Sequence, residues 1–320
     1  MKRAWVGRLL VGYLALAVSP LLAKGPGTTA APFLTISFGS RAQALGNSFV
    51  ALADDASSAY FNPAGLAQAQ SHKSSWRELQ ASRSAWFQGI EINQMALASF
   101  HPDRISWGLS LTGLEVEDLE RRTTESEKPD GYFRAEDHAF GLSLARRMGD
   151  GPIALGLTSK IVQQRIASAQ GHSFGLDAGA QVKFKAFRQP FSAGFAVRNL
   201  GPQLHLGREA FPLPLSYHFG IAYRGLVNQV MELSVSPRGR TDISLGTEYW
   251  FLGVFGIRGG YLHSNRSSSG EENSFAGFSF KQGVTGGFGF KVMNFFSADY
   301  AFVPFGDLGY AQRFTMSYKF

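Results

Sequence analysis

The side chains that most often do chemistry are scattered along this 320-residue chain. Its seven histidines include no His-Glu-x-x-His pattern and no other close pair with the spacing of metal ligands. No Gly-x-Ser-x-Gly sequence marks a nucleophilic serine, and the glycine-rich run at 286–290 lacks the Lys-Ser/Thr of a phosphate-binding loop. We therefore expect no enzymatic activity, no metal site and no cofactor.

A segment of mostly small residues near the N-terminus is the strongest candidate for a functional site. Asp54 or Asp55 could cap a short helix that follows them. Asn62 would end that helix, because Pro63 disfavours the α conformation in the residue before it, and Pro63-Ala64-Gly65 would start a turn. Residues 24–70 do not alternate between apolar and polar types, and a compact segment of this kind can plug the lumen of a barrel.

The first 23 residues have the features of a secretory signal peptide. Three cations precede an apolar run from Leu9 to Leu22, small residues follow, and we place the cleavage near Ala23. A short membrane anchor is the alternative, but the run is short and contains Pro20. Without these three cations the formal charge falls from +7 to +4, a mild excess with no basic block, so we expect no nucleic-acid partner. The chain has no cysteine, which excludes disulfides and thiolate metal sites.

Most of the remaining chain alternates between apolar and polar residues with a period of two. Segments of about ten such residues match a tilted strand that crosses a bilayer, and in lipid the apolar parity must face outward. Together with an export signal, this pattern predicts an all-β protein, a transmembrane antiparallel β-barrel in a bacterial outer membrane. A secreted β-sandwich is the alternative. The alternating segments are 137–147, 153–161, 172–184, 191–198, 217–224, 241–249, 255–261 and 311–320.

The lengths of the connections predict the topology. If the last strand runs down to a periplasmic C-terminus, short turns fall on the periplasmic side and long loops fall outside. Residues 274–291 keep one parity throughout, so we predict a single long strand there and about 14 strands in all, an even number as in single-chain bacterial barrels. The predicted inner turns are His101–Asp103, Met148–Gly151, Phe187–Pro190, Gly225–Asn228 and Met293–Asn294. The predicted outer loops are Leu114–Glu136, Leu200–Leu215, Ser264–Asn273 and Val303–Tyr310.

Several short sequences occur in a fixed order between about residue 39 and the C-terminus. They are Ala53-Asp54-Asp55-Ala56, Asn62-Pro63-Ala64-Gly65-Leu66-Ala67, Phe174-Gly175-Leu176-Asp177-Ala178-Gly179, Arg198-Asn199-Leu200-Gly201-Pro202, Arg258-Gly259-Gly260-Tyr261 and residues 299–309. Together they resemble the FadL-like outer-membrane proteins, and the PorV/PorQ family in particular. The resemblance implies a 14-stranded barrel with an N-terminal hatch that carries the Asn-Pro-Ala segment inside the lumen. It also implies that the terminal Phe320 is read by the barrel-assembly machinery.

Two functions follow from this resemblance. The first is a channel for hydrophobic small molecules, with Asp54, Asp55, Asn62, Pro63, Ala64 and Gly65 in the hatch. The alternative is a barrel of type IX secretion that binds exported protein cargo through its outer loops. The charged segment from Glu115 to Glu136 would then be a docking surface, or else simply a solvated loop.

We expect three parts in the chain and a small set of partners. The parts are a signal peptide at 1–23, a plug at 24–70 and the barrel at 71–320. The partners are the lipid bilayer of the outer membrane, the barrel-assembly machinery, and either a hydrophobic ligand or a secreted protein.

Overall fold

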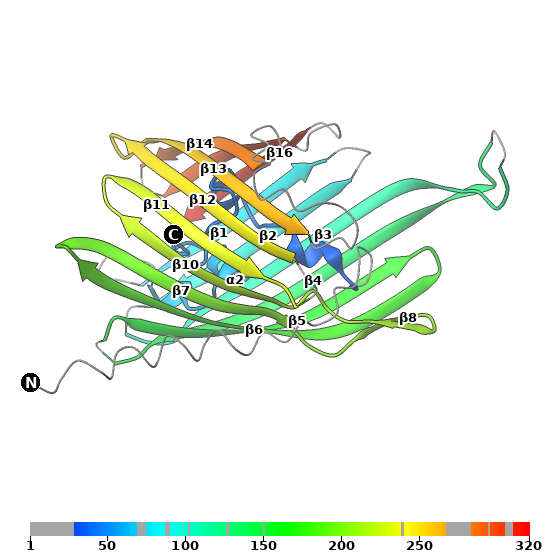
Figure 1. Ribbon diagram of the computed structural model, residues 1–320, viewed down its shortest axis with the longest axis horizontal. Coiled ribbons are helices and arrows are strands. Elements are labelled where there is room, and N and C mark those ends of the chain that lie inside the picture. The colour runs from blue at the N-terminus through cyan, green and yellow to red at the C-terminus, as the bar shows by residue number, and fades with distance from the viewer. Residues whose placement is uncertain are drawn as a thin grey trace, which may run out of the picture.

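The alternating strands close into an antiparallel barrel of 14 strands in the computed structural model (Figure 1). None of the helices among the described residues is long and apolar enough to cross a membrane. The predicted signal peptide at 1–23 lies outside the described residues and stays a prediction. The structure describes residues 29–68, 75–86, 90–101, 103–125, 128–149, 151–237, 240–266, 283–293, 295–304 and 310–320.

Every barrel strand pairs with its neighbour along the chain, and β1 pairs with β16 to close the ring. β7 pairs directly with β10, because β8 and β9 form a separate two-stranded sheet. The strands are β1 (Trp76–Ala85), β2 (Glu91–Phe100), β3 (Ser106–Arg121), β4 (Gly131–Arg147), β5 (Ile153–Ile166), β6 (Ala169–Ala186), β7 (Gln189–Leu200), β8 (Leu204–Leu206), β9 (Glu209–Phe211), β10 (Ser216–Arg224), β11 (Val227–Val235), β12 (Arg240–Phe251), β13 (Phe255–Arg266), β14 (Val284–Val292), β15 (Phe296–Pro304) and β16 (Tyr310–Lys319).

The two parities of the strands face lipid and lumen as predicted. On β6, Phe174 and Ala178 are exposed on the outside, whereas Asp177 and Gln181 are buried inside. The exposed large apolar residues form a belt around the barrel, which on β5 includes Ile153, Leu155, Leu157 and Ile161. Such a surface is stable only against hydrocarbon, so the belt is the membrane-facing surface.

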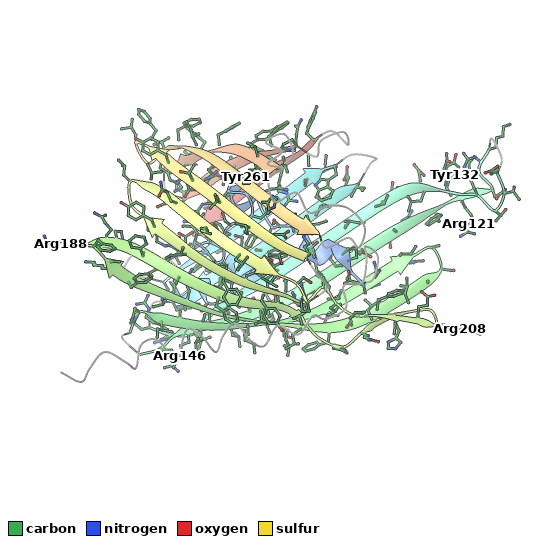
Figure 2. All side chains as sticks on the ribbon, in the orientation of Figure 1. Arg121, Tyr132, Arg146, Arg188, Arg208 and Tyr261 are labelled. Carbon is green, nitrogen blue, oxygen red and sulfur yellow. The ribbon has the colours of Figure 1, made fainter. Side chains whose placement is uncertain are left out.

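The two ends of the barrel differ in their connections. At the end that holds the C-terminus, which we call the Phe320 end, short turns join β2–β3, β4–β5, β6–β7, β10–β11, β12–β13 and β14–β15. The predicted inner turns all fall at these connections. At the opposite end, which we call the loop end, the β3–β4 hairpin projects beyond the other strands, with Arg121 and Tyr132 near its tip (Figure 2).

The prediction of an outer loop over Leu114–Glu136 is wrong over most of its length. β3 continues to Arg121 and pairs there with Gly131, the first residue of β4, with a register shift between Val116 and Leu119. The alternation is lost because this part of the hairpin stands beyond the lipid, where both of its faces meet water. The pattern of a membrane strand therefore ends before the strand does.

The other three predicted outer loops are partly strand, and in Val303–Tyr310 the strand residues are Val303 and Pro304 of β15 and Tyr310 of β16. β8 and β9 lie within Leu200–Leu215, and β13 continues to Arg266. The predicted strand at 274–291 lies partly outside the described residues, and from residue 284 it forms β14. The predicted barrel of 14 strands is confirmed.

Candidate functional site

Residues 29–68, which we call the hatch, lie inside the barrel. The hatch begins at the loop end, where the N–H of Ala30 donates to the carbonyl of Pro212 at 3.0 Å. It ends at the Phe320 end, where the side-chain amide of Gln68 donates to the carbonyl of Pro152 in the β4–β5 turn. Its short helices are η1 (Pro32–Thr35), α1 (Ser40–Ala44), α2 (Ser58–Phe61) and α3 (Gly65–Gln68). Helices of this length are not stable alone, so their packing against the barrel wall must stabilise them.

Glycines on the inner wall let the backbone of the hatch approach the barrel closely. A Cβ atom on Gly246 of β12 would lie 2.7 Å from the carbonyl oxygen of Leu45, and one on Gly287 of β14 would lie 2.6 Å from the Cβ of Ala44. Both distances are shorter than real Cβ atoms tolerate, so these positions require glycine while the hatch is seated. Gly156, Gly179, Gly194, Gly220 and Gly260 also meet hatch atoms in this way.

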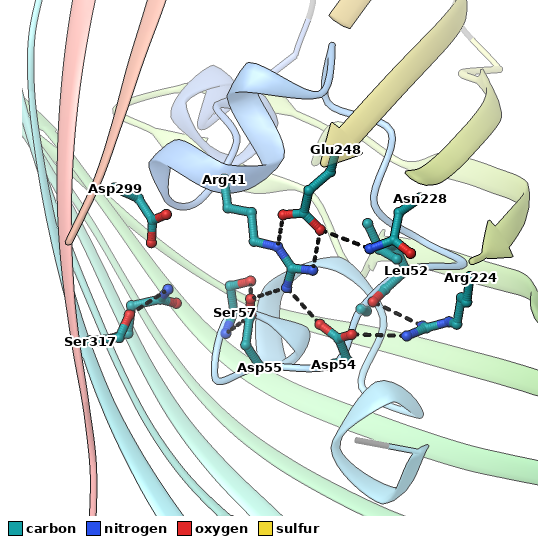
Figure 3. Close-up of polar contacts among 12 residues, drawn as sticks. Arg41, Leu52, Asp54, Asp55, Ser57, Arg224, Asn228, Glu248, Asp299 and Ser317 are labelled. Atoms are coloured by element: carbon teal, nitrogen blue, oxygen red, sulfur yellow. Dashed lines mark hydrogen bonds and ion pairs between the residues drawn. The ribbon is translucent and has the colours of Figure 1, made fainter. Parts of the chain in front are cut away.

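Arg41 of α1 joins the hatch to the wall through a charged network (Figure 3). Its Nε and Nη2 donate to the two carboxylate oxygens of Glu248 on β12, each at 2.9 Å. Its Nη1 donates to Asp54 at 2.6 Å and to Asp55 at 3.0 Å. Paired donation to one carboxylate is the strongest geometry available to arginine, so Arg41 ties both acids of the hatch to the barrel.

Wall residues extend the network on both sides. Arg258 of β13 donates to Glu248 at 2.8 Å and to Asp299 of β15 at 2.7 Å. Arg224, the last residue of β10, donates to the second carboxylate oxygen of Asp54 at 2.8 Å. Buried charges are tolerated only when they are paired, so the loss of one member leaves an unpaired buried charge that destabilises the folded protein.

The network accounts for the acidity of Asp54. Burial by itself raises the pKa of Asp54, but the positive charges of Arg41 and Arg224 outweigh burial and lower the pKa to about 2. Burial also opposes the charge on Arg41, yet Asp54 and Glu248 hold the pKa of Arg41 well above its ordinary value. Both groups are therefore ionised at neutral pH.

Asn62 links two turns of the hatch to the wall. Its Nδ2 donates to the carbonyl of Val50 at 2.9 Å and to the carbonyl of Ala180 on β6 at 3.1 Å. Its Oδ1 accepts the N–H of Ala64 at 3.2 Å. A side-chain amide supplies both the donors and the acceptor that these three contacts need.

The residues around Asn62 behave as the sequence indicates. α2 ends at Phe61, and the turn through Pro63 and Ala64 leads into α3. Gly65 packs on Ala53, whose carbonyl oxygen would lie 2.6 Å from a Cβ atom at position 65. The turn is thus closed on itself and leaves no room for a side chain at that position.

Neither Asp54 nor Asp55 is the N-cap of a helix, contrary to the prediction. The N-cap of α2 is Ser57, which makes no capping hydrogen bond with its side chain. Asp55 instead accepts from the N–H and the hydroxyl of Ser57, at 3.0 and 2.5 Å, in a turn before the helix. The ion pairs with Arg41 explain the difference, because they hold both carboxylates towards the guanidinium.

At the loop end the hatch packs into an apolar cluster. Phe33 and Leu34 are buried there against Leu204 of β8 and Leu213, which lies just before β10. Ile36, Leu114, Leu206 and Phe211 border this cluster. The hydroxyl of Tyr60 donates to the carbonyl of Leu34 at 2.8 Å and so connects the cluster to α2.

Sequence reasoning missed the wall side of the network, namely Arg224, Glu248 and Arg258. A signal was present in the hatch itself, since Arg41, Asp54 and Asp55 are the only charged residues between 29 and 68. In the part of the chain that the structure describes, no group of three or more acidic or histidine side chains has the arrangement of a metal site.

Phe320 lies at the closure of the barrel. Its N–H donates to the carbonyl of Arg77 at 3.0 Å, and its own carbonyl accepts from the N–H of Arg77 at 2.9 Å. Its ring stacks on Tyr318 with 5.8 Å between centroids and is exposed. The last residue therefore extends the pairing of β16 with β1.

Comparison with known proteins places this hatch and barrel in a family. A family model described as "Type IX secretion system protein PorV" matches residues 24–237. The chain belongs to the PorV family. The resemblance to the PorV/PorQ family noted in the sequence is thus confirmed, and no curated protein matches the chain.

Solved structures show the same fold for this PorV-family chain. The CymD monoaromatic hydrocarbon channel has a TM-score of 0.62 at 11% identity, covering 88% of this chain and 96% of CymD. The Pseudomonas putida toluene transporter TodX has a TM-score of 0.58 at 11% identity, covering 88% and 96% of the two chains. A Pseudomonas aeruginosa FadL homologue has a TM-score of 0.56 at 11% identity, covering 88% and 98%. At such identities the likeness establishes the fold alone.

The family, the barrel and its apolar belt together identify an integral outer-membrane protein of the FadL/PorV type. The family model is named for type IX secretion, and the solved structures with this fold include hydrocarbon channels.

Proposed function

We propose that this PorV-family protein is a hatch-gated channel for hydrophobic small molecules. The observation that carries the proposal is the apolar cluster at the loop end, in which Phe33 and Leu34 of the hatch occupy the inside of the barrel. An apolar molecule that enters between the outer loops can take the place of these two side chains. The hydrocarbon channels with the same fold support this class of ligand.

Passage then requires the hatch to shift within the lumen. We propose residues 24–70 as the plug, of which the hatch is the described part, residues 71–320 as the barrel and residues 1–23 as the cleaved signal. Asn62, Pro63, Ala64 and Gly65 hold the turn between α2 and α3, while Asp54 and Asp55 anchor the hatch to the wall through Arg41. Backbone atoms of the hatch lie directly against the glycines of the wall. A small displacement of the hatch would therefore break many of these contacts at once.

A reversible lock on the hatch tests the proposal. The hydroxyls of Ser40 on α1 and Thr315 on β16 lie 2.8 Å apart, and the chain has no cysteine of its own. In a Ser40→Cys/Thr315→Cys variant, oxidation should block uptake of labelled toluene or fatty acid into cells, and reduction should restore it. The two single variants under the same treatments are the controls. Equal uptake by locked and reduced protein, with the cross-link verified by mass, would count against a moving hatch.

The second candidate is a barrel of type IX secretion that binds exported cargo. It is favoured by the family match over residues 24–237 and by the β3–β4 hairpin, which stands clear of the barrel where a protein could reach it (Figure 1). Shortening this hairpin to a tight turn should lower the amount of secreted cargo and leave uptake of small molecules unchanged. Normal secretion by the shortened protein, present at wild-type levels in the outer membrane, would exclude this role of the hairpin.

A further inference from the structure

The turns at the Phe320 end carry large apolar side chains at their tips. These residues are Ile105, Met148, Phe187, Leu226, Leu252 and Met293, and their exposure ranges from 51% for Ile105 to 97% for Phe187. They lie at the turns after β2, β4, β6, β10, β12 and β14, and so surround the rim of the barrel. We call them the turn-tip ring. So much apolar surface around one rim indicates a contact with something other than water.

The backbone at three of these tips disfavours the residues found there. Phe187, Leu252 and Met293 each have φ of 50°, in the left-handed region that glycine and asparagine adopt easily. A side chain with a Cβ loses about 1–2 kcal/mol in that region. Folding of the turns would favour glycine or asparagine, so the bulky apolar residues are not explained by the turn itself.

At three neighbouring turns an exposed arginine lies within two residues of the apolar tip. Arg104 precedes Ile105, Arg146 lies two residues before Met148, and Arg188 follows Phe187. Figure 2 shows Arg146 and Arg188 at the Phe320 end of the molecule, pointing away from the strands. The same turns contain two acids in sequence, Asp103 and Asp150.

The membrane-facing belt reaches these turns. On β5 it begins at Ile153, directly after the β4–β5 turn, and extends to Ile161. At about 3.3 Å per residue and a tilt of about 40°, this stretch spans about 20 Å across the bilayer, close to the usual height of such a belt. Exposed aromatic side chains at the same end include Phe184, Phe251, Phe255, Phe290, Phe295, Tyr318 and Phe320. The turn tips therefore continue the lipid-facing surface into the headgroup layer.

We propose that the turn-tip ring sits in the inner leaflet of the outer membrane, and that the three arginine-bearing turns bind anionic phospholipid there. The apolar tips would lie between headgroups and acyl chains, and the guanidinium groups would contact lipid phosphates. A bilayer encircles the barrel, as the ring does. A single protein partner would account for a cluster of tips on one side, but not for tips on turns around the rim.

Depth measurement on single cysteines tests the position of the ring. Phe187→Cys and Leu226→Cys, labelled with a fluorophore, are reconstituted in phosphatidylcholine vesicles that contain lipids with headgroup-level spin labels. Arg208→Cys, in the β8–β9 turn at the loop end, is the matched exposed control. We expect strong quenching by the spin-labelled lipid and weak quenching by aqueous iodide at positions 187 and 226, and the reverse at position 208. Iodide quenching at 187 equal to that at 208 would overturn the proposal and favour a protein partner instead.

Lipid preference tests the arginines separately. The immobilised fraction of spin-labelled phosphatidylglycerol, relative to phosphatidylcholine, is measured for the wild type and for an Arg104→Gln/Arg146→Gln/Arg188→Gln variant. The preference for phosphatidylglycerol should fall by about fivefold for each cation in contact with the surface. A variant with Arg121→Gln, Arg134→Gln and Arg165→Gln near the loop end should keep the wild-type preference. An unchanged preference in the first variant, confirmed as a folded barrel, would refute the lipid assignment of these turns.

Discussion

Arg41 of the hatch and Glu248 of β12 form a bidentate ion pair inside the barrel, with both N–O distances at 2.9 Å. The two residues are 207 positions apart in the chain, and the side chain of Glu248 is fully buried. Arg41 meets both acids of the hatch at the same point, so this one residue holds the N-terminal segment to the wall. Removal of this pair by mutation therefore tests how firmly the hatch is held in the barrel.

Replacing Arg41 by methionine should loosen the hatch. The change leaves Asp54, Asp55 and Glu248 short of a partner, and breaking a buried pair from one side costs about 3–5 kcal/mol. Limited proteolysis of the purified barrel should then cut within the hatch, while the barrel strands stay protected. Arg83→Met is the control, because the Arg83–Glu91 pair is exposed and worth less than about 1 kcal/mol. Equal protection of the hatch in both variants would contradict a clamp at Arg41.

Stability of the hatch should depend on pH in the acid range. The pKa of Asp54 is lowered in the folded protein from 3.8 to about 2, so its carboxylate binds fewer protons when folded than when unfolded. Its contribution is complete above about pH 4 and is lost as the pH falls towards about 2. Hydrogen exchange of the hatch amides between pH 5 and pH 2 measures this loss. Asp54→Asn should remove this part of the dependence, and a profile unchanged by that substitution would show that other groups control it.

A glycine-to-alanine substitution on the barrel wall should displace the hatch, but only where the new methyl group faces the lumen. Gly260 of β13 lies against the backbone of Gly46, whereas Gly259 beside it has only the side chain of Thr247 at 3.8 Å. Gly260→Ala should therefore expose the hatch to protease, and Gly259→Ala should not. Both variants should keep the resistance of the folded barrel to unfolding in detergent on a gel. If the two behave alike, the wall glycines do not seat the hatch.

Replacement of Asn62 should destabilise the protein. Asn62→Ala leaves the carbonyls of Val50 and Ala180 without their donor, a loss of about 1–3 kcal/mol when the groups are buried. Asn62→Asp keeps the acceptor for Ala64 but removes the donor, so it should be as damaging as alanine. Urea unfolding of the reconstituted protein compares the two, and a neutral effect of both would mean that water replaces the amide.

Loss of Phe320 should impair assembly rather than stability. Its ring contacts Tyr318 and is otherwise exposed, and its backbone adds one pair of hydrogen bonds to the closure of β16 on β1. We expect deletion of Phe320 to lower the amount of folded barrel in outer-membrane fractions, while protein refolded in vitro stays close to the wild type. Wild-type levels in cells would argue against Phe320 as an assembly signal.

The sequence by itself determined the class of the protein and much of its topology. A strand between lipid and lumen must alternate between apolar and polar residues, so the alternation at 172–184 predicts β6. Pro63 disfavours the α conformation in Asn62, so the sequence also predicts the end of the helix there. These are local constraints, and they need no knowledge of distant residues. Beyond the lipid a strand need not alternate, so the sequence did not predict the outer part of the β3–β4 hairpin, which continues as strand.

Only the tertiary structure decided which residues meet. Arg41 and Glu248 come together because the hatch folds back into a closed barrel, and no spacing in the chain encodes that distance. The same is true of Asp54 and Asp55, which pair with arginine rather than cap a helix, because a buried guanidinium outweighs a local hydrogen bond. Alternation can be read within a single strand, whereas a buried ion pair forms only when distant segments fold together inside the barrel.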